Sequence, residues 1–321
     1  MRAGFLAVGA PGAPLRPGDV ARLEGAGIDS LWAAGHVTTG RAVPEVVTGV
    51  ARLAALTERV TVGTAVTVLP LYHPVVLAKQ FAEVDRATGG RLAVGVGVGG
   101  EYPVEFDACG VPPAERGPRT DEAIEVLRAL WTGGEVTREG RWWPLRGVGV
   151  APPPARVGGP PLYVAGRRPP AMRRAARLGD GWLPFLYSPR AYAASRRTIE
   201  LLAGQAGRDL RSFEWLCFVY TRVDDDAAAA RRAALDFVGA AQAGDGGRFE
   251  SMLGRMSAVG TPAEVGTALQ RYLDAGARHL VLACCAHDDL LDQCRKVAEE
   301  VLPRLGPPDV GRYREVVDAG R

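Results

Sequence analysis

The sequence predicts a (β/α)8 barrel of the TIM type, an α/β fold in which eight parallel strands alternate with helices. Short β-branched or apolar runs alternate with amphipathic helical patterns along most of the chain, and eight strand-helix pairs can be distinguished. A length of 321 residues accommodates this fold without a second domain. We therefore expect a single domain over residues 1–321.

The expected elements follow one another in regular order. Strands are predicted at residues 3–8, 29–34, 60–66, 91–97, 161–165, 181–186, 214–222 and 278–284. Helices are predicted from the spacing of their apolar residues at 17–26, 43–57, 74–88, 119–132, 169–178, 189–204, 224–241, 262–275 and 288–303. Gly89 and Gly90 suit the end of a helix that leads directly into the next strand.

Two segments interrupt this alternation. Residues 133–160, after strand four, combine turn residues, short β-like runs and a proline cluster. Residues 239–260, after strand seven, are rich in glycine and then helical. Insertions of this length are typical of lids and binding loops. Trp142 and Trp143 in the first insertion are expected either to cover the site or to pack within the arm or a dimer interface.

Composition excludes several classes of function. The net charge is +3, from 39 basic and 36 acidic residues scattered along the chain, so no basic surface for nucleic acid is indicated. No apolar run reaches the roughly 18 residues needed to span a membrane. The N-terminus does not resemble a signal peptide, and the cysteines at 109, 217, 284, 285 and 294 lack C-x-x-C spacing. A reduced, cytoplasmic setting is expected.

Cys284, Cys285 and His287 lie close together in the sequence, but we do not interpret them as a metal site. Cys284 and Cys285 are expected to point to opposite faces of a strand, and no fourth ligand is near.

A glycine run marks the end of the fourth predicted strand. In RLAVGVGVGGEYP (91–103), Gly95, Gly97 and Gly100 have the G-x-G-x-x-G spacing of dinucleotide-binding folds. Such a unit requires a helix directly after the third glycine. Here prolines follow, and no regular helix is expected before about Arg119. We therefore interpret the run as a barrel strand whose backbone approaches a flat ligand.

Four segments carry a resemblance to a known family. They are GAGIDSLWAAGHV (25–37), RVTVGTAVTVLPLYHPVVLAKQFAEVDRATGGRLAVGVGVGG (59–100), FDACGVPPAERGPRTDEAIEVLRALW (106–131) and PPLYVAGRRPPAMRRAARLGDGWLP (160–184). Together they resemble the luciferase-like monooxygenase superfamily, and in particular its branch of oxidoreductases that use the deazaflavin coenzyme F420. The resemblance implies a TIM barrel that binds F420 or reduced FMN at its C-terminal mouth, and a homodimer.

The resemblance also implies roles for individual residues. His36 ends strand two, where F420-dependent members place an Asp-His pair, but the Asp position is Gly35 in this chain. Glu101 matches an acidic residue that follows the strand-four glycines and exchanges a proton beside the substrate. His36 and Glu101 are therefore the catalytic candidates. The alternatives are a histidine that hydrogen-bonds the turn and a solvated loop carboxylate.

The cofactor-binding candidates follow from the same comparison. The strand-three stretch 64–67 matches backbone that supports the ring, sometimes through a non-prolyl cis peptide. Gly166, Arg167 and Arg168 replace the small residues of a phosphate loop, and the two arginines suit a polyanionic tail. His73 is either a cofactor contact or the residue that precedes a helix starting at Pro74. The full set is Thr64, Ala65, Val66, Thr67, His73, Gly97, Val98, Gly99, Gly166, Arg167 and Arg168.

The expected function is transfer of a hydride between F420 and a small organic substrate, with a nearby acid moving the proton. His36, Glu101, the two arginines and a composition typical of GC-rich genomes favour F420. The main alternative is an FMNH2-dependent two-component monooxygenase supplied by a separate reductase. A third is a non-catalytic flavin-binding barrel, which the absence of an acid at Gly35 keeps open.

Overall fold

Eight parallel strands close into a barrel in the computed structural model, which describes residues 1–8, 15–39, 43–241, 253–309 and 311–313. The barrel strands are β1 (Arg2–Val8), β2 (Ser30–Ala33), β3 (Thr61–Val68), β4 (Leu92–Gly97), β7 (Leu162–Val164), β8 (Gly181–Trp182), β9 (Glu214–Val223) and β11 (His279–Cys284). Each pairs in parallel with its neighbour, and β1 pairs with β11 to close the barrel. The predicted TIM barrel is confirmed, because every expected strand overlaps an observed one.

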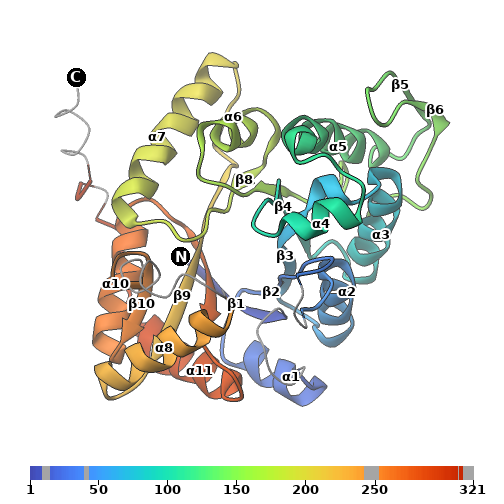
Figure 1. Ribbon diagram of the computed structural model, residues 1–321. Helices are drawn as coiled ribbons and strands as arrows, with labels where there is room; N and C mark the ends of the chain where they lie inside the picture. The colour runs from blue at the N-terminus through green and yellow to red at the C-terminus, as the bar shows by residue number, and fades with distance from the viewer. Residues whose placement is uncertain (9–14, 40–42, 242–252, 310, 314–321) are drawn as a thin grey trace.

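Helices surround the strands on the outside (Figure 1). They are α1 (Pro17–Gly25), α2 (Val46–Leu56), α3 (Pro74–Ala87), α4 (Pro103–Ala108), α5 (Arg116–Leu130), α6 (Pro169–Leu178), α7 (Pro189–Gln205), α8 (Ala227–Ala241), α10 (Pro262–Asp274) and α11 (Leu290–Lys296). The helix expected at 288–303 is regular only over α11 and continues as a π-helical turn and a 3-10 turn. Among the described residues no helix combines the length and the apolarity that a membrane crossing requires.

The expectation that no helix begins before Arg119 is wrong. Helix α4 begins at Pro103, directly after the glycine run, and α5 begins at Arg116. Pro103 occupies the first position of α4 and Pro118 lies in the first turn of α5, where a helix has no use for the missing backbone N–H. The dinucleotide-fold alternative remains excluded, because the glycines belong to a closed barrel.

Both insertions contain strands. The first forms the antiparallel hairpin of β5 (Val136–Arg138) and β6 (Leu145–Val148), which lies beside α5 at the edge of the molecule (Figure 1). The second ends in β10 (Ser257–Gly260), a strand that sequence analysis missed and that pairs in parallel with β9 outside the barrel. Residues 242–252 of the second insertion lie outside the described residues.

The structure does not support a lid formed by the tryptophans of the first insertion. Trp143 is buried in the main core, and the indole N–H of Trp142 donates to Glu115 at 3.1 Å. The carboxylate of Glu122 accepts from the backbone N–H groups of residues 141–143 and so holds the hairpin against α5. The packing alternative is therefore the correct one within this chain.

Two apolar cores follow from the alternation of strand side chains. The larger lies between the strands and the surrounding helices, and the smaller fills the interior of the barrel around Trp32, Tyr163, Leu216 and Val281. The interior core fills the barrel beneath the C-terminal ends of the strands.

Candidate functional site

A cavity of about 540 Å³ opens at the C-terminal ends of the barrel strands. This is the end at which TIM barrels place their active sites, and the volume lies in the usual range for small-molecule sites. Residues from the ends of β1, β2, β3, β4, β7, β8, β9 and β11 contribute to its wall: Leu6, Ala34, Gly35, His36, Thr39, Val43, Pro44, Ala65, Val66, Val68, Gly97, Val98, Gly99, Glu101, Tyr102, Ala165, Gly166, Leu183, Phe185, Phe218, Tyr220 and His287.

The structure brings most of the predicted site residues together at this cavity. Those that line it are His36, Glu101, Ala65, Val66, Gly97, Val98, Gly99 and Gly166. Thr64 and Thr67 lie behind the wall. His73, Arg167 and Arg168 are not among the lining residues. Most of the predicted residues thus lie at one cavity, and Thr64 and Thr67 lie next to its wall.

His36 is paired with a buried carboxylate that sequence analysis missed. Its Nδ1 lies 3.0 Å from Oε1 of Glu105, whose side chain is 1% exposed, while His36 itself is 26% exposed. The second oxygen of Glu105 accepts the backbone N–H of Val37 at 2.9 Å. With Glu105 as acceptor, Nδ1 carries the proton, and Nε2 is left to exchange a proton with a ligand. The ring edge of His36 also packs against Tyr102, with centroids 4.7 Å apart.

The backbone of Pro44 explains why glycine stands at the expected Asp position. A Cβ built on Gly35 would meet the carbonyl oxygen of Pro44 at 2.1 Å, and that same oxygen accepts the backbone N–H of His36. An aspartate at this position would require the backbone at Pro44 to move. The carboxylate that orients His36 comes instead from α4, a helix that was not expected because of the prolines around it.

Glu101 lies at the cavity mouth with a raised pKa. Burial raises the pKa of its carboxyl above the ordinary value, interactions with His36 and Arg167 offset part of this, and the charge of Glu105 adds to it. Solvent still reaches the side chain, because the mouth is open while protein surrounds it on the other sides. Glu101 therefore keeps its proton to a higher pH than an ordinary glutamate and is suited to proton transfer.

The glycine run fits an irregularity in the neighbouring strand. Pairing between β3 and β4 shifts between Thr64 and Thr67, around a cis peptide bond between Ala65 and Val66. A Cβ on Gly95 would meet the carbonyl oxygen of Thr64 at 2.2 Å, and one on Gly97 would meet a methyl group of Val66 at 2.9 Å. Gly95 thus leaves room for the β3 backbone, and Gly97 lies on the cavity wall.

Two threonines secure this junction from behind. The hydroxyl of Thr64 donates to the carbonyl oxygen of Gly95 at 2.8 Å, and the hydroxyl of Thr67 donates to that of Thr64 at 3.2 Å. Both side chains are fully buried. Their contribution to a ligand is through the backbone that they hold in place.

The turn after β7 places its two arginines differently. Arg167 donates from Nη1 to the carbonyl oxygen of Leu186 at 2.7 Å, and its Cζ lies 5.3 Å from the ring centroid of Phe185. Arg168 is exposed and precedes α6, whose first two residues are the prolines 169 and 170. Prolines offer no N–H to an anion, and Arg168 is the exposed cation at this turn.

His73 is exposed and directly precedes Pro74 at the start of α3. This position is the one expected of a residue at a helix start and gives it no place on the cavity wall.

Three aromatic side chains, Phe185, Phe218 and Tyr220, form an aromatic wall of the cavity. The rings of Phe185 and Phe218 meet edge to face with centroids 6.4 Å apart, and Phe218 and Tyr220 do the same at 5.5 Å. Burial raises the pKa of the Tyr220 hydroxyl well above its ordinary value, so it stays protonated. This wall comes from the ends of β8 and β9.

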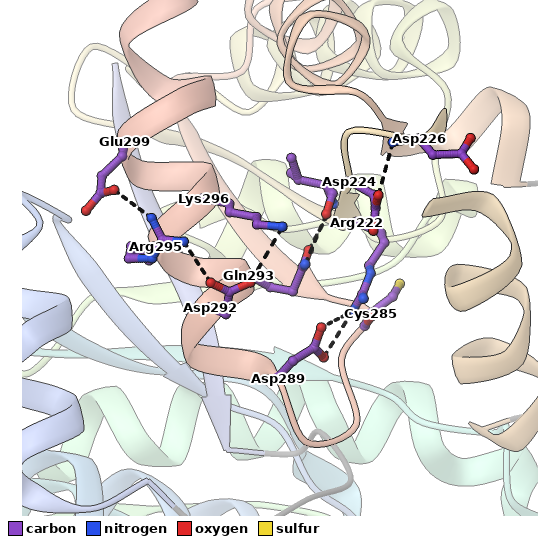
Figure 2. Close-up of polar contacts among 11 residues, drawn as sticks. Arg222, Asp224, Asp226, Cys285, Asp289, Asp292, Gln293, Arg295, Lys296 and Glu299 are labelled. Atoms are coloured by element: carbon purple, nitrogen blue, oxygen red, sulfur yellow. Dashed lines mark hydrogen bonds and ion pairs between the residues drawn. The ribbon is translucent and has the colours of Figure 1, made fainter. Parts of the chain in front are cut away.

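Arg222 anchors the loop between β11 and α11 (Figure 2). His287, in this loop, lines the cavity. Nη1 of Arg222 donates to the carbonyl oxygen of Cys285 at 3.0 Å and pairs with the carboxylate of Asp289 at 2.7 Å, on either side of His287. The Gln293 amide forms two hydrogen bonds with the backbone of Val223, at 2.9 and 3.0 Å. These contacts join α11 to the end of β9 and fix the position of the loop.

Sequence analysis missed the residues that flank the predicted ones. These are Glu105, Tyr102, Phe185, Phe218, Tyr220 and His287. The aromatic residues had a usable signal, since Phe218 and Tyr220 alternate with outward-facing positions near the end of a predicted strand. Glu105 had none, because its position depends on a helix that was not expected.

Comparison with known proteins identifies relatives of this architecture. The luciferase-like monooxygenase family matches residues 19–279. An F420-dependent glucose-6-phosphate dehydrogenase of Beutenbergia cavernae is 32% identical over 88% of this chain and 90% of its own. A solved F420-dependent secondary alcohol dehydrogenase in complex with an F420-acetone adduct aligns with a TM-score of 0.81 at 22% identity, covering 95% of this chain and 99% of its own. The monooxygenase RslO1 of Streptomyces bottropensis aligns with a TM-score of 0.81 at 26% identity, covering 94% and 99%.

Proposed function

The chain belongs to the luciferase-like monooxygenase family, and from this premise we propose that it is an F420-dependent oxidoreductase that transfers a hydride to or from a small organic substrate. One observation carries the proposal: the His36–Glu105 pair and Glu101 meet at the mouth of one cavity. The similarity to an F420-dependent dehydrogenase over nearly the whole chain supports F420 as the cofactor.

The cavity fits a flat, largely uncharged ring. The Ala65–Val66 segment and the backbone from Gly97 to Gly99 form one side, where the glycine at 97 leaves room for a close approach. When bound there, F420 supplies or accepts a hydride. Arg168 is the described side chain at the β7–α6 turn that is available for an anionic part of the cofactor.

The protein's own residues manage the proton that accompanies the hydride. In the oxidative direction an alcohol loses its hydroxyl proton to Nε2 of His36 as its carbon-bound hydrogen leaves as hydride. In the reductive direction the same nitrogen returns a proton to the carbonyl oxygen. Glu105 holds the imidazole in the required orientation and stabilises it when it is charged. Glu101, with its raised pKa, provides a second proton donor beside the substrate.

An FMNH2-dependent monooxygenase is the second candidate. The similarity to RslO1 at 26% identity favours it. The non-catalytic alternative was based on the absence of an acid at Gly35, and Glu105 supplies a carboxylate in its place. An assay separates the two enzymatic readings. The substrate is incubated under labelled O2 with either reduced F420 or FMNH2. Our proposal expects turnover with reduced F420 and no labelled oxygen in the product. Oxygen insertion with FMNH2 alone would contradict it.

We further propose that the protein acts as a homodimer in the cytoplasm and that, where it works in the reductive direction, a separate reductase supplies reduced F420. The family supports the dimer. The five free cysteines support a reducing setting. Light scattering on the purified protein tests the dimer, since a monomer mass at working concentration would contradict it.

A further inference from the structure

The lining of the cavity carries information about the substrate. We propose that the substrate is a neutral molecule with an aromatic or otherwise flat apolar body and an alcohol or carbonyl group, and not a phosphorylated or carboxylated one. This inference rests on the proposed function, because it names the substrate class of the same site. It differs from what the name of the Beutenbergia cavernae relative states for that protein.

The first argument is the apolar character of the substrate side. Leu6, Leu183, Phe185 and Phe218 are apolar residues of the cavity wall that belong to one packed cluster. Phe185 and Phe218 pack edge to face, an arrangement that keeps their rings fixed. A flat apolar body that packs on them buries its own surface and theirs at roughly 25 cal/mol per Å².

The second argument is the charge of the lining. Among the described residues that line the cavity there is neither lysine nor arginine, while Glu101 lies at its mouth and the Glu105 carboxylate lies directly behind His36. Arg167 is the cation whose charge reaches Glu101, but its guanidinium is engaged by the Leu186 carbonyl and by the ring of Phe185. An anionic substrate would therefore find no lysine or arginine among the described lining residues, and its desolvation beside Glu101 would be costly.

The third argument is the position of the polar groups. His36, the polar group that follows β2, lies four strands around the barrel from Phe185, which follows β8. A molecule with one oxygen function on an apolar body matches this division, because its oxygen meets His36 while its body meets Phe218. A sugar phosphate, which is polar on every side, matches neither half.

The test compares two probes of nearly equal shape that differ in charge. Binding of 2-acetonaphthone, a neutral ketone, and of 2-naphthoate, its carboxylate counterpart, is measured by ligand-observed NMR, together with glucose 6-phosphate. We expect the ketone to bind at least about tenfold more tightly than naphthoate, and glucose 6-phosphate not to compete. Equal or tighter binding of either anion, or binding of neither naphthyl probe, would overturn the proposal.

Each titration is run with and without F420. If F420 fails to bind while the ketone is still preferred, the proposed cofactor is wrong and the substrate class stands. If F420 binds and the preference is absent, the substrate class alone is wrong. The two failures are thus distinguishable.

A matched pair of variants ties the preference to the wall. Phe218→Leu removes a ring from the cavity, and Phe213→Leu removes one that packs on Trp215 near the other end of the same strand. Phe213 and Phe218 are 7% and 8% exposed. We expect Phe218→Leu to weaken ketone binding roughly three- to tenfold and Phe213→Leu to leave it unchanged. Equal effects of the two variants would contradict a role of the wall.

Discussion

Oε1 of Glu105 lies 3.0 Å from Nδ1 of His36, so a carboxylate from α4 orients an imidazole that follows β2. The two residues are separated by 69 positions in the sequence and meet because β2 ends, and α4 follows the end of β4, at the same rim of the barrel. This pair takes the place of an Asp-His pair that Gly35 cannot provide. It makes Glu105 a positioning residue and His36 the group that meets the substrate.

Glu105→Gln should reduce turnover more than it reduces binding. The carboxylate accepts from both His36 and Val37, whereas an amide has one acceptor oxygen and must turn its NH2 toward one of these donors. We expect kcat to fall about tenfold or more, equivalent to about 1.4 kcal/mol of transition-state stabilisation, with the KM nearly unchanged. Steady-state kinetics against pH measure this.

Glu122→Gln is the control for that substitution. Glu122 is also a buried glutamate that accepts backbone N–H groups, but it holds the hairpin of the first insertion. Its replacement should lower the melting temperature and leave kcat intact. A similar loss of kcat in both variants would mean that Glu105 acts only through stability.

Glu101→Gln should stabilise the protein above mildly acidic pH. A raised pKa means that the folded state holds this proton more tightly than the unfolded chain does. Stability is therefore lost as pH rises through the raised pKa, and a neutral amide escapes that loss. The melting temperature of the variant should exceed that of the wild type at pH 8. The difference should vanish near pH 4, where Glu101 is protonated in the folded protein and in the unfolded chain. Glu139→Gln, at an exposed hairpin position, should show no such trend.

His279 should make the fold sensitive to acid. Burial lowers the pKa of His279 to about 3, and its Nε2 lies 2.7 Å from the hydroxyl of Ser30 inside the barrel. The unfolded chain takes up this proton near pH 6.5 and the folded protein does not, so stability falls as pH drops below that value. The loss at pH 5 should be roughly 2 kcal/mol. Urea unfolding at pH 7 and pH 5 should show this difference in the wild type and a smaller one in His279→Gln.

Gly95→Ala should destabilise the barrel before it affects a ligand. The added Cβ would meet the Thr64 carbonyl oxygen at 2.2 Å, a backbone contact that cannot rotate away. We expect a loss of about 1 to 3 kcal/mol. Gly134→Ala is the control, because a Cβ there meets nothing within 4 Å. If both variants unfold at the same urea concentration, the packing explanation of the glycine run is incorrect.

Much of the fold was predictable from local patterns. The strands and most helices were recognisable because TIM barrels repeat short apolar strands and amphipathic helices, and the family resemblance located His36 and Glu101 at the cavity. Between Gly100 and Arg119 the prolines wrongly predicted the absence of a helix, since Pro103 starts one. Glu105 was not identified as a site residue because it lies in that helix. β10 pairs with β9, and the backbone of Pro44 packs against Gly35. Local sequence patterns do not predict such tertiary contacts.

The identity of the cofactor is the central claim, and direct titration tests it most simply. Purified protein is titrated separately with F420 and with FMN while the fluorescence of each cofactor is followed. Our account predicts saturable binding of F420 and much weaker binding of FMN. Tight binding of FMN without binding of F420 would contradict it.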